Sequence, residues 1–164
     1  ATLYASGEEC AVGNISCQYS SPRGTVYKST DDGETWQRIP GFPGPGGHDI
    51  QVLDADKIFI KSRIATRLYF SMDAGLSWDS AMAPANQSII GFKMLNDSVG
   101  FVGTSSGKVY STLNRGAAWQ LVHSLGSQPV SKIESAGDYL TAASQGSVAI
   151  SKDRGATWTN ENLG

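Results

Sequence analysis

The chain has 164 residues and a formal net charge of −2, with 40% hydrophobic and 17% charged residues. This composition excludes the highly charged, poorly hydrophobic class of chains that stays disordered. Nucleic-acid binding is not expected, because it needs clustered Lys and Arg for phosphate neutralisation. No run approaches the 18 apolar residues of a membrane span.

The predicted elements are short strands that recur in a fixed order. An inner strand is expected at residues 50–54, 89–95 and 130–135. A second strand is expected at 3–7, 58–62, 100–104 and 139–144. A third is expected at 26–29, 68–71, 109–112 and 148–151, and a fourth follows each tryptophan. No segment keeps the apolar spacing of a helix, so the sequence predicts an all-β fold.

An eight-residue phrase is repeated between the third and fourth strands. It reads STDDGETW at 29–36, SMDAGLSW at 71–78, TLNRGAAW at 112–119 and SKDRGATW at 151–158. The four tryptophans are 42, 41 and 39 residues apart. A period near 40 with four antiparallel strands per repeat predicts the blades of a β-propeller.

The phrase has the chemistry of a tight hairpin. Its acidic or amide side chain is expected to accept a backbone N–H two residues on, at Asp31, Asp73, Asn114 and Asp153. Its glycine supplies a positive φ, at Gly33, Gly75, Gly116 and Gly155. Its indole is expected to start the fourth strand and pack between blades, at Trp36, Trp78, Trp119 and Trp158.

This phrase resembles the Asp-box, or BNR repeat, whose pattern is S/T-x-D-x-G-x-T/S-W. Three copies match closely, and the third departs at Asn114 and Ala118. Proteins with this repeat include sialidases, sortilin-type receptors, xyloglucan-active glycosidases and photosystem assembly factors. The resemblance implies a structural, peripheral role for the box. It also implies one propeller domain over 1–164, with blades at approximately 1–47, 48–87, 88–127 and 128–164.

The first blade lacks its innermost strand, because the run at residues 3–7 takes the place of a second strand. We therefore expect 15 strands where four complete blades need 16. An unpaired strand edge attracts another strand, so we expect a protein partner or a copy of the same chain to complete this blade. The alternatives are a piece of a longer propeller, or a small ring of four blades.

Several features favour a secreted protein. Cys10 and Cys17 lie in one loop and are expected to form a disulfide, with free thiols as the alternative. The three glycosylation sequons begin at Asn14, Asn86 and Asn96. The chain begins ATLYASG without an initiator Met, which is consistent with signal removal or with trimming. We expect no metal and no cofactor.

No catalytic residue is predicted. The acidic residues are concentrated in the boxes and outer loops, away from the facing carboxylates that glycosidases need. A ligand face is predicted instead from the loops that join strands and blades, with Glu9, His48, Arg63, Arg67 and His123 as candidates. The two arginines suit a carboxylate or sulfate, although a solvated pair is the more ordinary interpretation.

Tyrosine recurs at one place in three blades, at Tyr27, Tyr69 and Tyr110. This recurrence indicates packing between blades, and it also suits a lectin with one glycan pocket per blade. The sequence therefore predicts a non-catalytic, secreted propeller module for protein binding or self-assembly. The alternatives are a glycan-binding propeller and a fragment of a glycoside hydrolase of the sialidase or xyloglucanase type.

Overall fold

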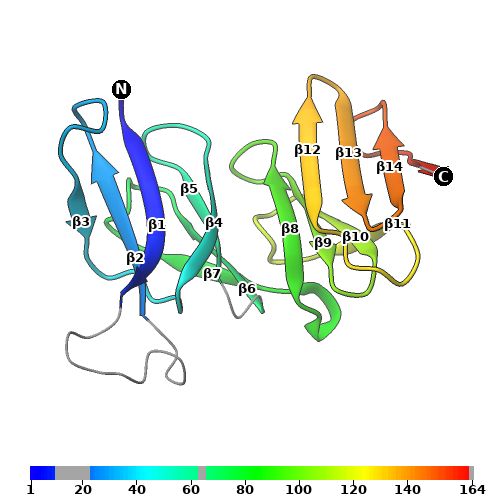
Figure 1. The fold of residues 1–164 in the computed structure, drawn as a ribbon, viewed down its shortest axis with the longest axis horizontal. Helices are drawn as coiled ribbons and strands as arrows, with labels where there is room; N and C mark the ends of the chain where they lie inside the picture. The colour runs from blue at the N-terminus through cyan, green and yellow to red at the C-terminus, as the bar shows by residue number, and fades with distance from the viewer. Residues whose placement is uncertain (10–22, 63–65, 163–164) are drawn as a thin grey trace. The chain divides into compact units, whose positions relative to one another are not determined.

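The computed structural model describes residues 1–9, 23–62 and 66–162. These residues form fifteen strands and one 3₁₀ turn, η1 (Pro84–Asn86), so the all-β prediction is confirmed (Figure 1). The helical turn was not predicted, because three residues are too few to show a period; it begins at a proline, which suits the first helical position. The chain divides into two compact units, residues 1–80 and 81–164.

The first unit holds a three-stranded sheet and most of a four-stranded sheet. The three-stranded sheet has the order β1-β2-β3, formed by Leu3–Glu9, Arg23–Ser29 and Gln37–Ile39. The second sheet has the order β4-β5-β6-β7, formed by Gly47–Val52, Ile58–Ser62, Arg67–Ser71 and Asp79–Met82. The prediction that the first blade has three strands is confirmed.

The second unit holds two antiparallel sheets of four strands each. The first contains β8 to β11, formed by Ile89–Met94, Gly100–Thr104, Lys108–Thr112 and Gln120–Ser124. The second contains β12 to β15, formed by Lys132–Ala136, Tyr139–Ser144, Ser147–Ser151 and Thr159–Asn162. In every sheet, strands that follow one another in sequence are neighbours, as in the blades of a propeller.

The core of each unit lies between its neighbouring sheets. In the first unit, Val26 of β2 packs with Ile58, Ile60 and Tyr69 of the next sheet. In the second unit the buried cluster comprises Phe101, Val109, Leu125, Val130, Ile133, Leu140, Ala142 and Ala149. Because the two sheets within each unit bury side chains against each other, the repeat places equivalent residues at the two equivalent junctions.

Candidate functional site

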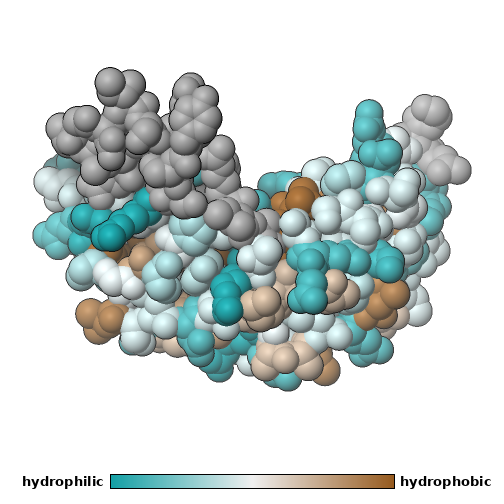
Figure 2. Space-filling view, turned by 90° about the horizontal axis from the view of Figure 1, so that it is seen from below, coloured by the Kyte–Doolittle hydropathy of each residue, from teal (hydrophilic) through white to brown (hydrophobic). Residues whose placement is uncertain are grey.

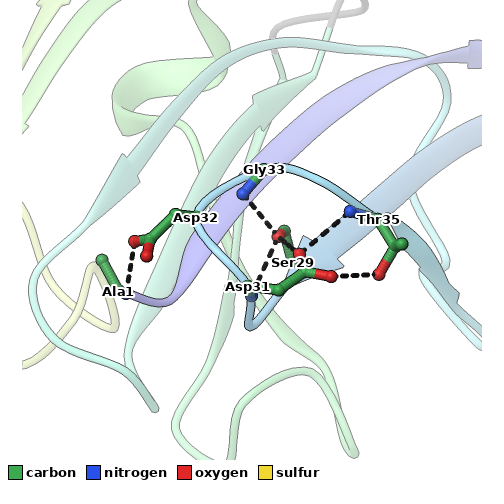
Figure 3. A network of polar contacts seen from close by, with 6 residues as sticks. All are labelled: Ala1, Ser29, Asp31, Asp32, Gly33 and Thr35. Carbon is green, nitrogen blue, oxygen red and sulfur yellow. Dashed lines mark hydrogen bonds and ion pairs between the residues drawn. The ribbon is translucent and has the colours of Figure 1, made fainter.

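The first Asp-box turn is closed by a network of polar contacts (Figure 3). Ser29 Oγ accepts hydrogen bonds from the backbone N–H groups of Gly33, at 2.9 Å, and Asp31, at 3.4 Å. Asp31 accepts from Thr35 twice: Oδ1 from the backbone N–H at 2.9 Å and Oδ2 from the hydroxyl at 2.5 Å. The expected bond of Asp31 with a backbone N–H two residues on is wrong, because the N–H of Gly33 donates to Ser29 Oγ and Asp31 accepts from the N–H of Thr35, four residues on.

The same turn recurs in the other three boxes, with a left-handed backbone at two successive residues. The box glycines have φ values of +94, +90, +86 and +90°, at Gly33, Gly75, Gly116 and Gly155. The preceding residues have φ values of 59, 58, 57 and 58°, at Asp32, Ala74, Arg115 and Arg154. The sequence did not predict the positive φ of the residue before each glycine, because Ala and Arg have no preference for a left-handed backbone.

The box carboxylates are held in the ionised form. Hydrogen bonds from the Ser29 hydroxyl and from Thr35 lower the pKa of Asp31 to about 2. Bonds from the hydroxyl and backbone of Thr157 and from Ser151 lower the pKa of Asp153 to about 2. Such groups are strong hydrogen-bond acceptors at neutral pH and poor proton donors. Their hydrogen bonds stabilise the turn.

The third box closes its turn with a neutral side chain, Asn114, in place of the aspartate. Asn114 Oδ1 accepts from the backbone N–H of Ala118 at 2.8 Å and from the hydroxyl of Thr112 at 3.0 Å. In the other boxes the second carboxylate oxygen accepts from a hydroxyl that Ala118 lacks. The two departures from the Asp-box pattern are therefore matched, because neither the second acceptor oxygen nor its donor is present.

The four indoles have different partners. The N–H groups of Trp36 and Trp158 donate to the carbonyl of the glycine in their own box, both at 3.1 Å. Trp119 donates to the carbonyl of Met82 at 2.8 Å, within the second unit. Trp78 packs edge-on against Phe42, with the ring centroids 4.9 Å apart. Each tryptophan lies one residue before the last strand of its sheet, so this predicted fourth strand begins one residue later than expected.

Two residues of the predicted ligand face take part in contacts between strands. Arg67 donates to Ser80 Oγ at 3.0 Å, across the outer part of its sheet. His123 Nε2 lies 2.6 Å from Asn160 Oδ1, and its ring stacks on Trp158 at 6.0 Å. These contacts join neighbouring strands or blades within one unit, which gives both side chains a packing role.

The remaining predicted residues divide by whether the structure describes them. Glu9 and His48 belong to β1 and β4, but their side chains lie outside the description. The calls that fall outside the described residues altogether are Cys10, Asn14, Cys17 and Arg63. Asn86 and Asn96 are exposed, and Asn96 Oδ1 accepts from the N–H groups of Ser98 and Val99.

The described part of the chain holds neither a metal-binding cluster nor a helix that could span a membrane. Residues 1–9, 23–62 and 66–162 contain no group of three or more His, Cys, Asp or Glu placed to hold a metal ion. Within these ranges no helix is both long and apolar enough to span a membrane. On the face drawn in Figure 2 the hydrophobic surface is divided into separate patches among hydrophilic side chains.

The remaining candidate site is the edge of β1 that faces away from β2. This strand pairs with β2 over its full length, from Leu3 opposite Ser29 to Glu9 opposite Arg23. Among the described residues no strand pairs with its other edge, whereas the equivalent edges of β5, β9 and β13 each carry an inner strand. β1 lies beside β4, but the two strands belong to separate sheets. Its outward N–H and C=O groups can accept an added strand.

Comparisons with known proteins agree with this architecture. Residues 27–38 match the model of the BNR/Asp-box repeat. A search of curated protein sequences finds no significant match. The expected resemblance to Asp-box propellers is confirmed by the matched repeat together with the fold of the similar structures below.

Three solved structures illustrate the similarity. An ancestral GH74 enzyme is 22% identical, with a TM-score of 0.62 over 81% of this chain and 20% of its own length. The GH74 enzyme of Niastella koreensis is 22% identical, with a TM-score of 0.60 over 82% of this chain and 21% of its own. YCF48 bound to D1 peptide is 17% identical, with a TM-score of 0.65 over 87% and 48%. The chain thus spans a fifth to a half of these structures, and the likeness shows the fold.

Proposed function

We propose that this chain is a non-catalytic propeller module that binds a protein partner, and that the partner adds an extended strand to β1. The observation that carries the proposal is the edge of β1 that faces away from β2, with which no strand pairs among the described residues. Strand addition obtains affinity from main-chain hydrogen bonds and specificity from alternate side chains.

The complete blades indicate what this edge accepts. In the second unit, β8 pairs antiparallel with β9 and β12 pairs antiparallel with β13. β4 pairs with β5 in the same way in the first unit. Since β1 has the place of β5, β9 and β13 relative to the box, the incoming segment is an antiparallel strand with alternating side chains.

Two further observations support binding over catalysis. The box carboxylates accept hydrogen bonds within their own turns and have lowered pKa values at Asp31, Asp73 and Asp153. One of the similar structures is a propeller described as bound to a peptide. The same fold also occurs in GH74 enzymes, so the proposal depends on the β1 edge and not on the fold.

Synthetic peptides copied from the chain test the proposal. Residues 47–52, 89–94 and 132–136 form the inner strands of the complete blades, and each can be made with solubilising lysines outside the copied segment. We expect at least one peptide to bind and to slow the hydrogen exchange of the β1 amides. The control is the same peptide with a central proline, which removes a main-chain donor and fits poorly within a sheet.

The outcomes separate the alternatives. If none of the peptides protects β1 at millimolar concentration, strand addition at this edge is wrong. Light scattering of the dilute chain tests whether the partner is a second copy: a folded monomer would remove self-assembly and leave a different protein as the partner. A glycan array separates both from the glycan-binding alternative, which predicts sugar binding that is indifferent to the peptides.

We also propose that the module acts outside the cell. The proposal is supported by the two cysteines close in sequence, Cys10 and Cys17, and by two sequons whose asparagines, Asn86 and Asn96, are exposed. Mass spectrometry of the chain from a secreting, glycosylating host tests it. Two free thiols together with unmodified asparagines would contradict the proposal.

A further inference from the structure

At the junction between the first and second blades, the first blade supplies side chains that cover an apolar surface of the second. We call the covering side chains the donating half and the covered surface the receiving half. The first blade donates Tyr4 and Ile39, which pack against a cluster around Ile58 and Ile60. The Ile39 side chain lies over the glycine of the receiving box, so closely that a Cβ on Gly75 would be 2.7 Å from Ile39 Cγ2. An aromatic and an aliphatic side chain of one blade thus cover the box and second strand of the next.

The junction between the third and fourth blades repeats this arrangement. Phe101 has the place of Tyr4, and its ring meets Trp158 edge-on, with centroids 6.1 Å apart. A Cβ on Gly155 would overlap the same ring. A β-bulge after Val109 brings both Val122 and His123 to the place of Ile39, and they pack on the receiving blade. Both junctions therefore use an aromatic residue on the second strand and an apolar contact from the fourth.

The first blade presents the same receiving half without a donor among the described residues. Its members are Leu3, Ala5, Tyr27, Gly33 and Trp36, equivalent in register to Ile58, Ile60, Tyr69, Gly75 and Trp78. Leu3 is 39% exposed and Trp36 is 43% exposed. The residues equivalent to Leu3 in the second and fourth blades, Ile58 and Leu140, are 0% and 1% exposed. The apolar pattern is present, but no other blade covers it among the described residues.

The fourth blade carries the opposite change on its donating face. Thr141 has the place of Tyr4 and Phe101, and Glu161, opposite Val148, has the place of Ile39 opposite Val26. Thr141 and Glu161 are exposed. A face with these groups cannot cover an apolar receiving half without burying charge.

We infer that the first blade is a docking site for a propeller blade that carries an aromatic side chain on its second strand and an aliphatic side chain on its fourth. The fourth blade of a second copy is excluded as the occupant by Thr141 and Glu161. Association at the first blade is therefore with a different blade, and head-to-tail growth of this chain does not occur. The inference concerns the face of the first blade and does not depend on strand addition at its edge.

A designed donor tests this inference. The donor is the full chain with Thr141→Phe and Glu161→Ile, which copy Phe101 and Ile39, and with Leu3→Lys, which blocks its own receiving half. It is mixed with the unmodified chain as acceptor, and complex formation is followed by analytical ultracentrifugation. We expect a 1:1 complex that is absent when either chain is alone.

Two acceptor variants make the test specific. Leu3→Lys should weaken the complex at least about tenfold, because the junction would bury the added charge. Leu113→Lys, at a leucine that is 76% exposed in the third box, is the matched control and should bind like the unmodified acceptor.

Three results would overturn the inference. They are a folded donor that gives no complex, a complex that is indifferent to Leu3→Lys, and head-to-tail oligomers of the unmodified chain that Leu3→Lys abolishes. If circular dichroism shows that the donor is misfolded, Thr141→Tyr with Glu161→Val replaces its two substitutions, on the precedent of Tyr4 and Val122. The edge peptides bind or fail independently of these results, so the two proposals are tested apart.

Discussion

The first and fourth blades contain the same box turn in different surroundings. In both, a serine hydroxyl and an aspartate close the turn with the same set of hydrogen bonds, and the indole donates to the carbonyl of its own box glycine. Around the fourth box, Phe101 and His123 pack on Trp158. Trp36 of the first box is 43% exposed. The hydrogen bonding of the turn is therefore local, while the packing of its indole and glycine depends on the blade before it.

The largest difference is expected at the box glycine. Alanine at Gly155 or Gly33 meets a similar left-handed backbone, with φ of +90 and +94°, which costs about 1 kcal/mol. At Gly155 the added Cβ also overlaps Phe101, and overpacking adds about 1–3 kcal/mol. At Gly33 the nearest atom is Leu3 Cδ1 at 3.5 Å, an ordinary contact.

Urea unfolding should therefore show a loss of about 2–4 kcal/mol for Gly155→Ala and about 1 kcal/mol for Gly33→Ala. Gly146→Ala is the control for backbone strain alone, since its φ is +77° and no atom lies within 4 Å of the added Cβ. Equal losses at Gly155 and Gly33 would contradict the role assigned to the preceding blade.

The indoles should show the next largest difference. Trp158→Ala removes a partly buried ring that contacts Phe101 and His123 and should cost about 3 kcal/mol. Trp36→Ala removes a more exposed ring and should cost about 1 kcal/mol. Thermal unfolding of the two variants measures both, and a larger loss for Trp36 would show that the first blade is covered in solution.

The box aspartates should show no difference between the blades. Asp153→Ala and Asp31→Ala each remove the acceptor of a backbone and a hydroxyl hydrogen bond, so they should lower the melting temperature equally and by less than Trp158→Ala. Asp153→Asn should be milder, because Asn114 shows that an amide oxygen keeps the backbone bond. Unequal effects of the two alanine variants would mean that the turn is not local.

The smallest effect is expected from pH. The pKa values of Asp31 and Asp153 are lowered to about 2 from the usual value of 3.8. A carboxyl with a depressed pKa in the folded state stabilises the protein above its unfolded pKa, and this contribution is lost as pH falls through the folded one. Stability should thus decline between about pH 4 and pH 2. The free energy of unfolding of a double variant, Asp31→Asn with Asp153→Asn, should fall less over this pH range, as measured by urea unfolding at each pH.

The repeat explains why much of the fold was predictable from the sequence. Four boxes at a period near 40 indicate the blades, and the position of the run at residues 3–7 relative to the first box indicates its three strands. The backbone at Ala74 was not predictable, since the residue itself does not favour a positive φ and the turn imposes it.

The contacts between blades were less predictable. Histidine is a common residue of ligand sites, but the packing of His123 on Trp158 depends on a β-bulge in the strand pairing after Val109. A bulge of this kind leaves no mark in the local sequence. The exposure of Trp36 is likewise a property of the neighbouring structure, because its own box fits the repeat pattern at every position.

The presence of one indole per blade has a consequence for spectroscopy. The chain contains four tryptophans, and each lies beside one box. Trp36 is the most exposed, Trp119 donates to the main-chain carbonyl of Met82 in β7, and Trp158 is stacked on an imidazole ring. Replacing three of them by phenylalanine leaves a single tryptophan, whose selectively excited emission reports one blade, so the order in which the blades open can be followed without an added label.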